Sequence, residues 1–180
     1  MSNSELFADL GIPTDYGRSP RRPRYSEAQQ LEDVEPNVLG RMQRLAPETA
    51  LAWRKMKVAG LEAGVDLLLL SGFRSIGYQA DLIRKKLAAG QDIASILRVN
   101  AAPGFSEHHT GRAVDIATPG TRPLTEEFEK SAAFVWLREH AAGFGFGMPY
   151  DRDNELGFSY EPWHWSQLGV QNRRRSQSKG

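Results

Sequence analysis

The sequence contains no cysteine in its 180 residues. This absence excludes a disulfide framework, a zinc site built from thiolates and a thiol nucleophile. Cysteine-free proteins suit either side of a bacterial membrane, so the redox compartment stays open. Only four histidines are present, and any imidazole chemistry must use them.

Long apolar runs are also missing. The run at residues 67–70, like every other, falls far short of the roughly 20 apolar residues that span a bilayer. The N-terminal residues lack a basic stretch followed by an apolar one, so we expect no signal peptide. These features predict a cytoplasmic protein without membrane insertion.

Neither sign of charge dominates, because 23 basic and 22 acidic residues give a formal net charge of +1. This balance argues against a nucleic-acid partner for the whole molecule. Basic residues do cluster at residues 18–24 and 172–180. We interpret the first cluster as part of a solvated arm, with contact to a polyanion as the less favoured alternative. The second is expected to be a frayed tail.

The length suits a single domain with a core of its own. Residues 1–36 are polar and turn-rich, which predicts an N-terminal arm. The arm precedes a domain at residues 37–168, and residues 169–180 form a basic C-terminal tail.

Hydrophobic spacing and end signals predict the elements of this domain. Helices are expected at residues 47–63, 76–89, 92–97 and 125–142, and strands at 65–70, 113–117, 144–150 and 157–165. Ser75, Asp92 and Thr125 are the expected helix caps. Helices first and strands near the end indicate an α+β fold with a small central antiparallel sheet and helices packed against it.

Two short segments, residues 106–115 and 161–165, carry the candidate site. They supply His108, Asp115 and His164, and two imidazoles with one carboxylate leave zinc an open fourth position for water. The alternatives without a function are that Asp115 is a solvent-facing carboxylate and that His164 is hydrogen-bonded within an aromatic core. The loop before the strand has a glycine that permits a tight bend, which could bring His108 to Asp115.

Glu161 stands where a general base beside the third ligand is expected. Burial next to Trp163 would raise the pKa of its carboxyl toward neutrality. Residues three apart in a regular strand face opposite ways, so Glu161 and His164 can share a site only through a twist or bulge. Pro162 is the expected place for that irregularity.

Three further residues are of types that occur at such sites. Arg74, at the end of a predicted strand, is either an ordinary surface charge or a group that binds a carboxylate or an oxyanion. His109 is interpreted as lying behind the ligands or at the surface. His140 is expected at a helix C-terminus, where its charge is favourable.

Together, residues 71–75 with Gln79, residues 106–115 and residues 161–164 resemble the VanY-type D-alanyl-D-alanine carboxypeptidases. These are zinc metallopeptidases of bacterial cell-wall metabolism, related in fold to the lysostaphin-like peptidases and the hedgehog domain. The resemblance covers residues 46–167, and three ordered motifs are more specific than any one of them.

The resemblance implies a role for seven residues around one Zn2+ ion. His108, Asp115 and His164 would be the metal ligands, and Glu161 would be the catalytic base. Arg74 would stabilise the oxyanion or hold the substrate carboxylate. Ser106 and Gln79 would make further contacts with the substrate.

The implied function is a zinc-dependent carboxypeptidase that removes terminal D-Ala from peptidoglycan stem peptides or muropeptides, with L,D- or D,D-specificity, in cytoplasmic cell-wall recycling. One alternative is a phage-type endopeptidase that cleaves the L-Ala–D-Glu bond. The other is a non-catalytic zinc-containing module that binds wall peptides. Glu161 and Arg74 are both present, which favours a working enzyme.

Overall fold

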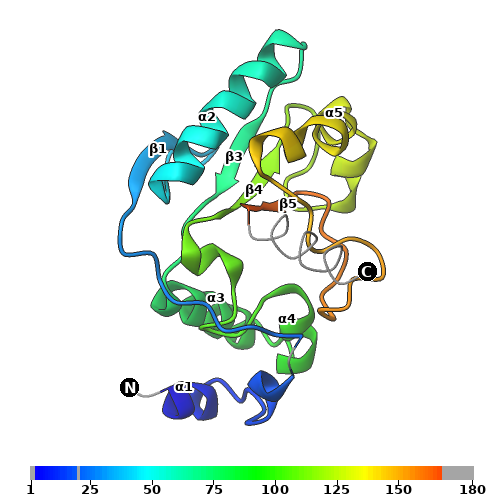
Figure 1. Cartoon of the computed structure of the whole chain (residues 1–180). Helices are drawn as coiled ribbons and strands as arrows, with labels where there is room; N and C mark the ends of the chain where they lie inside the picture. The colour runs from blue at the N-terminus through cyan, green and yellow to red at the C-terminus, as the bar shows by residue number, and fades with distance from the viewer. Residues whose placement is uncertain (1–2, 20, 168–180) are drawn as a thin grey trace, which may run out of the picture.

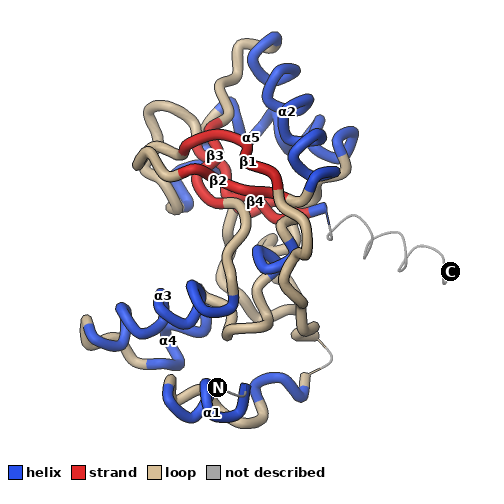
Figure 2. Tube along the Cα trace, turned by 90° about the vertical axis from the view of Figure 1, so that its left-hand side faces the viewer, coloured by secondary structure: helices blue, strands red, loops and turns tan. Residues whose placement is uncertain are grey.

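A computed structural model describes residues 3–19 and 21–167, and its elements form an upper and a lower group (Figures 1 and 2). The helices are α1 (Asn3–Asp9), α2 (Pro47–Glu62), α3 (Ile76–Ala88), α4 (Ile93–Val99) and α5 (Ala132–His140). The strands are β1 (Glu32–Pro36), β2 (Met42–Leu45), β3 (Leu68–Ser71), β4 (Ala113–Ala117) and β5 (His164–Ser166). Both sheets of the described chain are antiparallel, which confirms the predicted α+β class.

The central sheet has the order β3-β4-β5, and β1 pairs with β2 in a separate hairpin. Helices α2 and α5 lie in the upper group with this sheet (Figure 1). Their buried side chains, Trp53 and Leu137, join Leu69 and Ile116 of the sheet in one hydrophobic cluster. Because β4 is buried along its whole length, the sheet forms a rigid support for any side chain that it carries.

Local signals placed several elements correctly. Strand β4 spans the predicted residues, and α2 and α3 begin where predicted and end one residue early. The Ser75 hydroxyl accepts a hydrogen bond from the backbone of Tyr78, and the Asp92 carboxylate accepts one from Ser95. These caps satisfy amide groups that the first helical turn leaves unpaired.

The region predicted as one helix at residues 125–142 is divided in three. A 3-10 helix, η3 (Glu126–Lys130), is followed by α5 and then by a second 3-10 helix, η4 (Ala141–Phe144). The Ser131 hydroxyl accepts a hydrogen bond from the backbone of Phe134, so α5 has a cap of its own, whereas Thr125 makes no capping hydrogen bond through its side chain.

The two predicted closing strands were wrong over most of their length, although residues 164 and 165 of the second do lie in β5. Within residues 144–166, a strand forms only at residues 164–166, and Gly147 adds a single bridge to Ser166. Between them the chain turns on Asn154, whose side chain bonds the backbone of Asp151 and Phe158. Such local bonds satisfy the polar backbone without a ladder, so alternating apolar residues are not enough to make strands here.

The N-terminal segment is more than a solvated arm. Leu10, Ile12 and Tyr16 are buried in a second hydrophobic cluster, built on α3 and α4 in the lower group of Figure 2. Farther along, the backbone amide of Tyr25 donates to Gly104 and that of Ala28 to His109. The solvated-arm prediction was therefore wrong for these residues, whereas the domain boundaries at residues 36 and 168 stay predictions.

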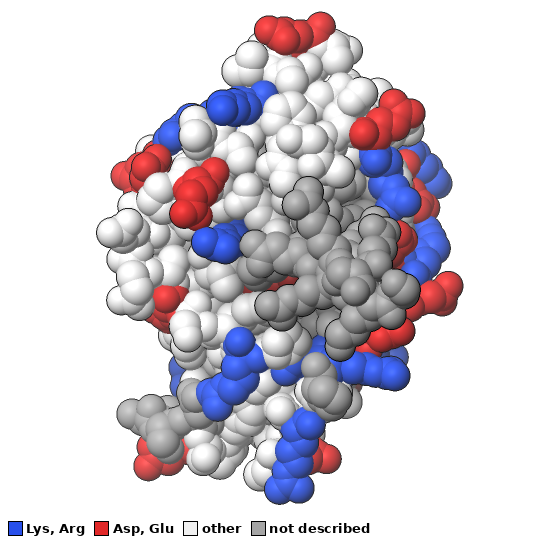
Figure 3. All heavy atoms as spheres, viewed as in Figure 1, with Lys and Arg blue, Asp and Glu red and all other residues white. Residues whose placement is uncertain are grey.

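No helix within the described ranges is long and apolar enough to cross a bilayer. Basic and acidic side chains are interspersed over the face seen in Figure 3, as the balanced composition predicts. The predicted basic tail at residues 169–180 lies outside the described residues.

Candidate active site

The pairing of β4 with β5 brings two of the predicted ligands together. Asp115 lies directly opposite His164 in the antiparallel register. Residues paired in this way point to the same face of the sheet. The 3-10 helix η2 (Glu107–Thr110), which comes shortly before β4, supplies His108. One ligand atom from each of the three buried side chains lies within 4.8 Å of the others.

His108 has its imidazole oriented by the backbone of the neighbouring strand. Its Nδ1–H donates to the carbonyl of Gly72 at 2.6 Å, which leaves the lone pair on Nε2. A side chain at Gly72 would not fit, because an added Cβ would lie 2.5 Å from the carbonyl oxygen of Arg44. Burial, aided by the charge of Arg74, lowers the pKa of His108 to about 4. The imidazole is therefore neutral near pH 7, as metal ligation requires.

The Nε2 atom of His108 is buried and has no hydrogen-bond partner. It faces Oδ2 of Asp115 at 3.3 Å, so an imidazole lone pair meets a carboxylate oxygen. Two such acceptors repel each other unless a proton or a cation lies between them. This arrangement fits a bound divalent cation, and histidine and aspartate are suitable ligands for zinc.

His164 lies between two carboxylates. Its Nδ1 is 3.0 Å from Oδ1 of Asp115, and its Nε2 is 2.9 Å from Oε2 of Glu107. Burial disfavours the charged imidazole, but the two carboxylates outweigh it and raise the pKa of His164 to about 10. The Tyr150 ring stacks on the imidazole, with 4.5 Å between ring centroids.

The Asp115 carboxylate is surrounded by three basic side chains. Burial alone would raise its pKa, but His108, His164 and Arg74 hold the pKa of this carboxyl well below its usual range. It therefore stays ionised in a buried position, where a carboxylate needs such partners.

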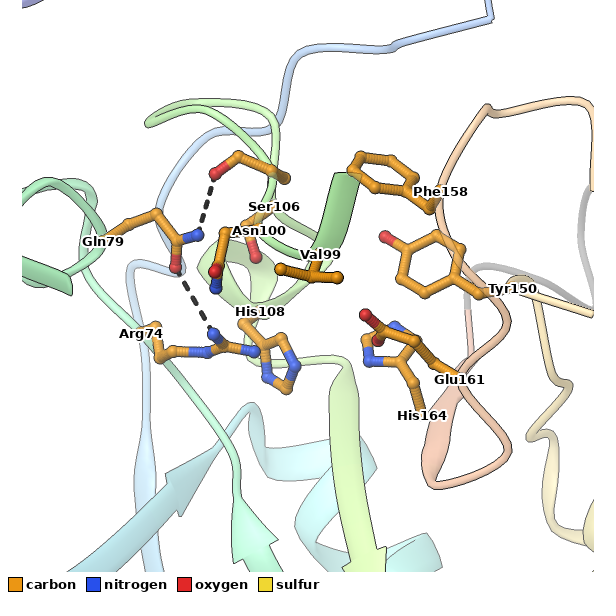
Figure 4. Close-up of a pocket in the computed structure, with 11 residues that line it drawn as sticks. Arg74, Gln79, Val99, Asn100, Ser106, His108, Tyr150, Phe158, Glu161 and His164 are labelled. Atoms are coloured by element: carbon orange, nitrogen blue, oxygen red, sulfur yellow. Dashed lines mark hydrogen bonds between the residues drawn. The ribbon is translucent and has the colours of Figure 1, made fainter. Parts of the chain in front are cut away.

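Glu161 reaches the site through a turn that contains Pro162, the expected place of the irregularity. The backbone amide of His164 donates to the carbonyl of Glu161 at 3.1 Å, which closes a turn just before β5. In Figure 4 the Glu161 carboxyl lies beside the His164 ring. Burial raises the pKa of Glu161 to about 7, in the direction predicted from the sequence.

Arg74 is held by two neighbours. One Nη atom donates to Oε1 of Gln79 at 3.4 Å and the other to Oδ2 of Asp115 at 3.3 Å. Gln79 is fixed in turn, because its amide donates to the carbonyl of Ala101 at 2.8 Å (Figure 4). The Nε–H of Arg74 is buried and has no partner, so one donor remains for a further group.

A small pocket of about 30 Å³ joins these groups. Six of the seven predicted site residues line it: Arg74, Gln79, Ser106, His108, Glu161 and His164. Figure 4 shows Arg74 and Gln79 on one side of the pocket and Glu161 and His164 on the other. Asp115, the seventh, contacts both of these histidines.

Two residues of the site were missed in the sequence. Glu107 stands inside the second motif, and a carboxylate next to a ligand histidine was the signal that could have singled it out. Nothing local marks Tyr150, which lies 14 residues before His164. Both contact the His164 ring.

The other two histidines lie outside the predicted ligand set. His109 is buried, its Nδ1 donates to the carbonyl of Arg74, and its Nε2 accepts from the amide of Gly104. It therefore holds the backbone near the site, which agrees with the first of its two predicted positions, behind the ligands. His140 is the last residue of α5 and lies against the Trp136 ring, as its helix-end prediction requires.

Comparison with known proteins decides the family. The family model described as "VanY: D-alanyl-D-alanine carboxypeptidase" matches residues 42–170. The chain belongs to the VanY family. It is 31% identical over 144 residues to the putative carboxypeptidase YodJ of Bacillus subtilis, covering 77% of this chain and 52% of YodJ. It is also 31% identical over 132 residues to VanXYC of Enterococcus gallinarum, a bifunctional D-Ala-D-Ala dipeptidase and carboxypeptidase, covering 70% and 68% of the two chains.

Solved structures of VanY-type proteins share the fold. The LD-carboxypeptidase LdcB has a TM-score of 0.65 at 27% identity, over 87% of this chain and 71% of LdcB. VanYB in complex with D-alanine-D-alanine has a TM-score of 0.65 at 26% identity, over 91% of this chain and 90% of VanYB. A VanY variant in complex with Zn(II) has a TM-score of 0.63 at 27% identity, over 81% of this chain and 82% of the variant. The chain spans about half the length of YodJ.

Proposed function

We propose that this chain is a zinc-dependent carboxypeptidase that removes terminal D-Ala from peptidoglycan-derived peptides. The observation that carries the proposal is the convergence of His108, Asp115 and His164, with Glu161 and Arg74 at the same pocket. The names of its relatives agree, since they describe D-Ala-D-Ala and LD-carboxypeptidases.

Zinc is the proposed metal, held by Nε2 of His108, a carboxylate oxygen of Asp115 and Nδ1 of His164. The orphaned Nε2 of His108 and its approach to Asp115 support this assignment. When bound, such an ion lowers the pKa of a water molecule and polarises a carbonyl group. Glu107 would then accept the Nε2–H of His164, which keeps the Nδ1 lone pair directed at the metal.

Glu161 is the proposed general base. A carboxyl with a pKa of about 7 can take a proton from the attacking water and return it to the leaving amine near neutral pH. It lines the pocket on the side opposite Arg74, so a peptide bound between them would present its scissile carbonyl to both (Figure 4).

Arg74 is proposed to carry negative charge of the substrate or the transition state. Its free Nε–H can bind the carboxylate of the terminal residue or the oxygen of the scissile carbonyl. Gln79 positions it, and Ser106 lines the same wall of the pocket. A small pocket with a buried guanidinium suits a chain that ends here, which favours a carboxypeptidase over an endopeptidase.

The test is mass spectrometry of zinc-loaded protein incubated with two muropeptides, one ending in diaminopimelate-D-Ala and one in D-Ala-D-Ala. Loss of alanine from the first alone indicates L,D-specificity, and from the second alone D,D-specificity. Glu161→Ala is the inactive variant, and Glu155→Ala, an exposed glutamate nearby, is its matched control. Internal cleavage would assign the endopeptidase, and no Glu161-dependent cleavage would assign the binding module. The cytoplasmic recycling role stays a prediction from the sequence.

A further inference from the structure

A second, larger groove opens next to the candidate active site. Its volume is about 480 Å³, and it shares Arg74 and Asp115 with the site. Its walls come from the β1–β2 hairpin, the end of β3 and the start of α3, with Leu124 at one edge. In Figure 2 the hairpin lies above α3. Residues of both elements line the groove.

The walls of this groove are unusually apolar for an exposed surface. The described chain exposes ten large hydrophobic residues, and four of them line the groove: Leu39, Met42, Tyr78 and Leu124. Leu124 has a φ of 55°, a left-handed conformation that a leucine adopts only at a cost in free energy. Exposed apolar side chains gathered in this way are typical of a binding surface.

Two cations also line the groove and lack acidic partners. Arg41 and Arg44 line the groove, and neither forms an ion pair with a described acidic side chain. Arg41 donates to the Tyr78 hydroxyl at 3.4 Å, and the Arg44 guanidinium lies 5.5 Å from the centre of the Phe73 ring. Both charges are therefore placed over the apolar walls and are free to bind an anion.

The two cavities differ in the length of chain that they can hold. The small pocket with Arg74, Gln79 and Ser106 has a volume of about 30 Å³, so it can admit only a small end group, whereas the groove has a volume of about 480 Å³. A peptide whose scissile bond lies at the ligand cluster would therefore extend its longer, amino-side part into the groove.

We propose that this groove binds the amino-side segment of the peptide and that Arg41 and Arg44 select segments that carry a carboxylate. This inference rests on the proposed function, and it narrows the substrate class to acidic peptides. A stem peptide with a γ-linked D-glutamyl residue has such a carboxylate, and amidation removes its charge without changing its length. Apolar walls would hold the aliphatic parts of the same segment.

The experiment compares two synthetic peptides, γ-D-glutamyl-L-lysyl-D-Ala-D-Ala and the same peptide with the glutamyl α-carboxylate amidated. The kcat/KM of the native protein is expected to be about tenfold higher for the acid, the equivalent of about 1.4 kcal/mol for a charge-assisted hydrogen bond. The double variant Arg41→Gln/Arg44→Gln should lose this preference, and Arg41→Glu/Arg44→Glu should reverse it. Because the readout is a ratio within one variant, a general loss of activity cancels.

The matched control is Lys55→Gln, which removes one exposed positive charge on α2, and it should keep the native ratio. Equal rates for the acid and the amide in the native protein, or a preference that persists in the Arg41→Gln/Arg44→Gln variant, would overturn the inference.

A binding measurement separates this inference from the proposed function. Calorimetric titration of the Glu161→Ala protein with the two peptides should give tighter binding of the acid, dependent on Arg41 and Arg44, whether or not the native protein hydrolyses either one. If binding depends on the two arginines but the native protein hydrolyses neither peptide, the carboxypeptidase function is refuted and the proposed role of the groove stands. Equal binding of both peptides would reject the groove, as would a dimer in solution that Leu39→Asp disrupts.

Discussion

Glu107 and His164 form a buried pair, with Oε2 of the carboxylate 2.9 Å from Nε2 of the imidazole. Asp115 lies at the other nitrogen of the same ring, 3.0 Å from Nδ1. The ring is thus held from both ends, and the Tyr150 ring stacks on one face. If Nε2–H donates to Glu107, the Nδ1 lone pair is directed at the ligand cluster, so Glu107 decides how the imidazole can bind a metal.

Replacing this carboxylate should weaken metal binding. Glu107→Ala is expected to lower zinc affinity by about 10- to 100-fold, because the imidazole loses the partner that orients it. Competition with a chromophoric chelator measures the affinity. Glu107→Gln, which can still accept from Nε2–H, should recover part of it, and exposed Glu62→Ala should match the native protein. Native affinity in Glu107→Ala would refute the orienting role.

Removing the proposed base should separate metal binding from turnover. Glu161→Ala is expected to keep a full equivalent of zinc and to lose about 10²- to 10⁴-fold in kcat, the range of general acid–base catalysis. Metal content by mass spectrometry and alanine release are measured on the same sample. Full activity in this variant would rule out Glu161 as the base.

The activity should fall on the acidic side of neutrality. Glu161 works as a carboxylate, and its pKa of about 7 means that it gains a proton as the pH falls through 7. A bound cation favours the carboxylate and moves this limb to lower pH. The kcat/KM profile is therefore expected to rise with pH and to level off at or below about pH 7. A profile that decreases from pH 5 to pH 7 would contradict the assignment.

Asp115 should matter for stability as well as for metal binding. Asp115→Ala removes the carboxylate that faces His108, His164 and Arg74 in a buried position. The variant is expected to bind no zinc and to lose about 3–5 kcal/mol in the free energy of unfolding, because positive charge is left buried without its partner. Urea denaturation of metal-free protein measures the second effect. Asp66→Ala, outside the site, serves as the control.

The N-terminal segment should contribute to the stability of the whole protein. Leu10 is 1% exposed and packs in the cluster built on α3 and α4. Leu10→Ala is expected to cost about 2–5 kcal/mol, the range for truncation of a buried leucine. Thermal unfolding checks this, with the exposed Leu61→Ala on α2 as the comparison. Equal melting temperatures for the two variants would mean that this segment is a dispensable arm.

The sequence by itself determined the features that depend on short stretches of chain. Capping residues such as Ser75 and Asp92 fixed where helices begin, and the alternation around Asp115 placed β4 without error. The three motifs identified the family and the residue types of the site. These features could be predicted because hydrogen bonds and side-chain periodicity act within a few residues.

Only the tertiary structure decided what meets across the chain. The register that sets Asp115 opposite His164, the carboxylate of Glu107 at the far nitrogen of that ring and the burial of Tyr16 depend on contacts between distant residues. The predicted strand at residues 144–150 failed for the same reason: the segment begins in the 3-10 helix η4, and Gly147 forms its one bridge, to Ser166 of β5. Alternation of residues shows which face is apolar, but pairing and burial are settled when separate segments pack together.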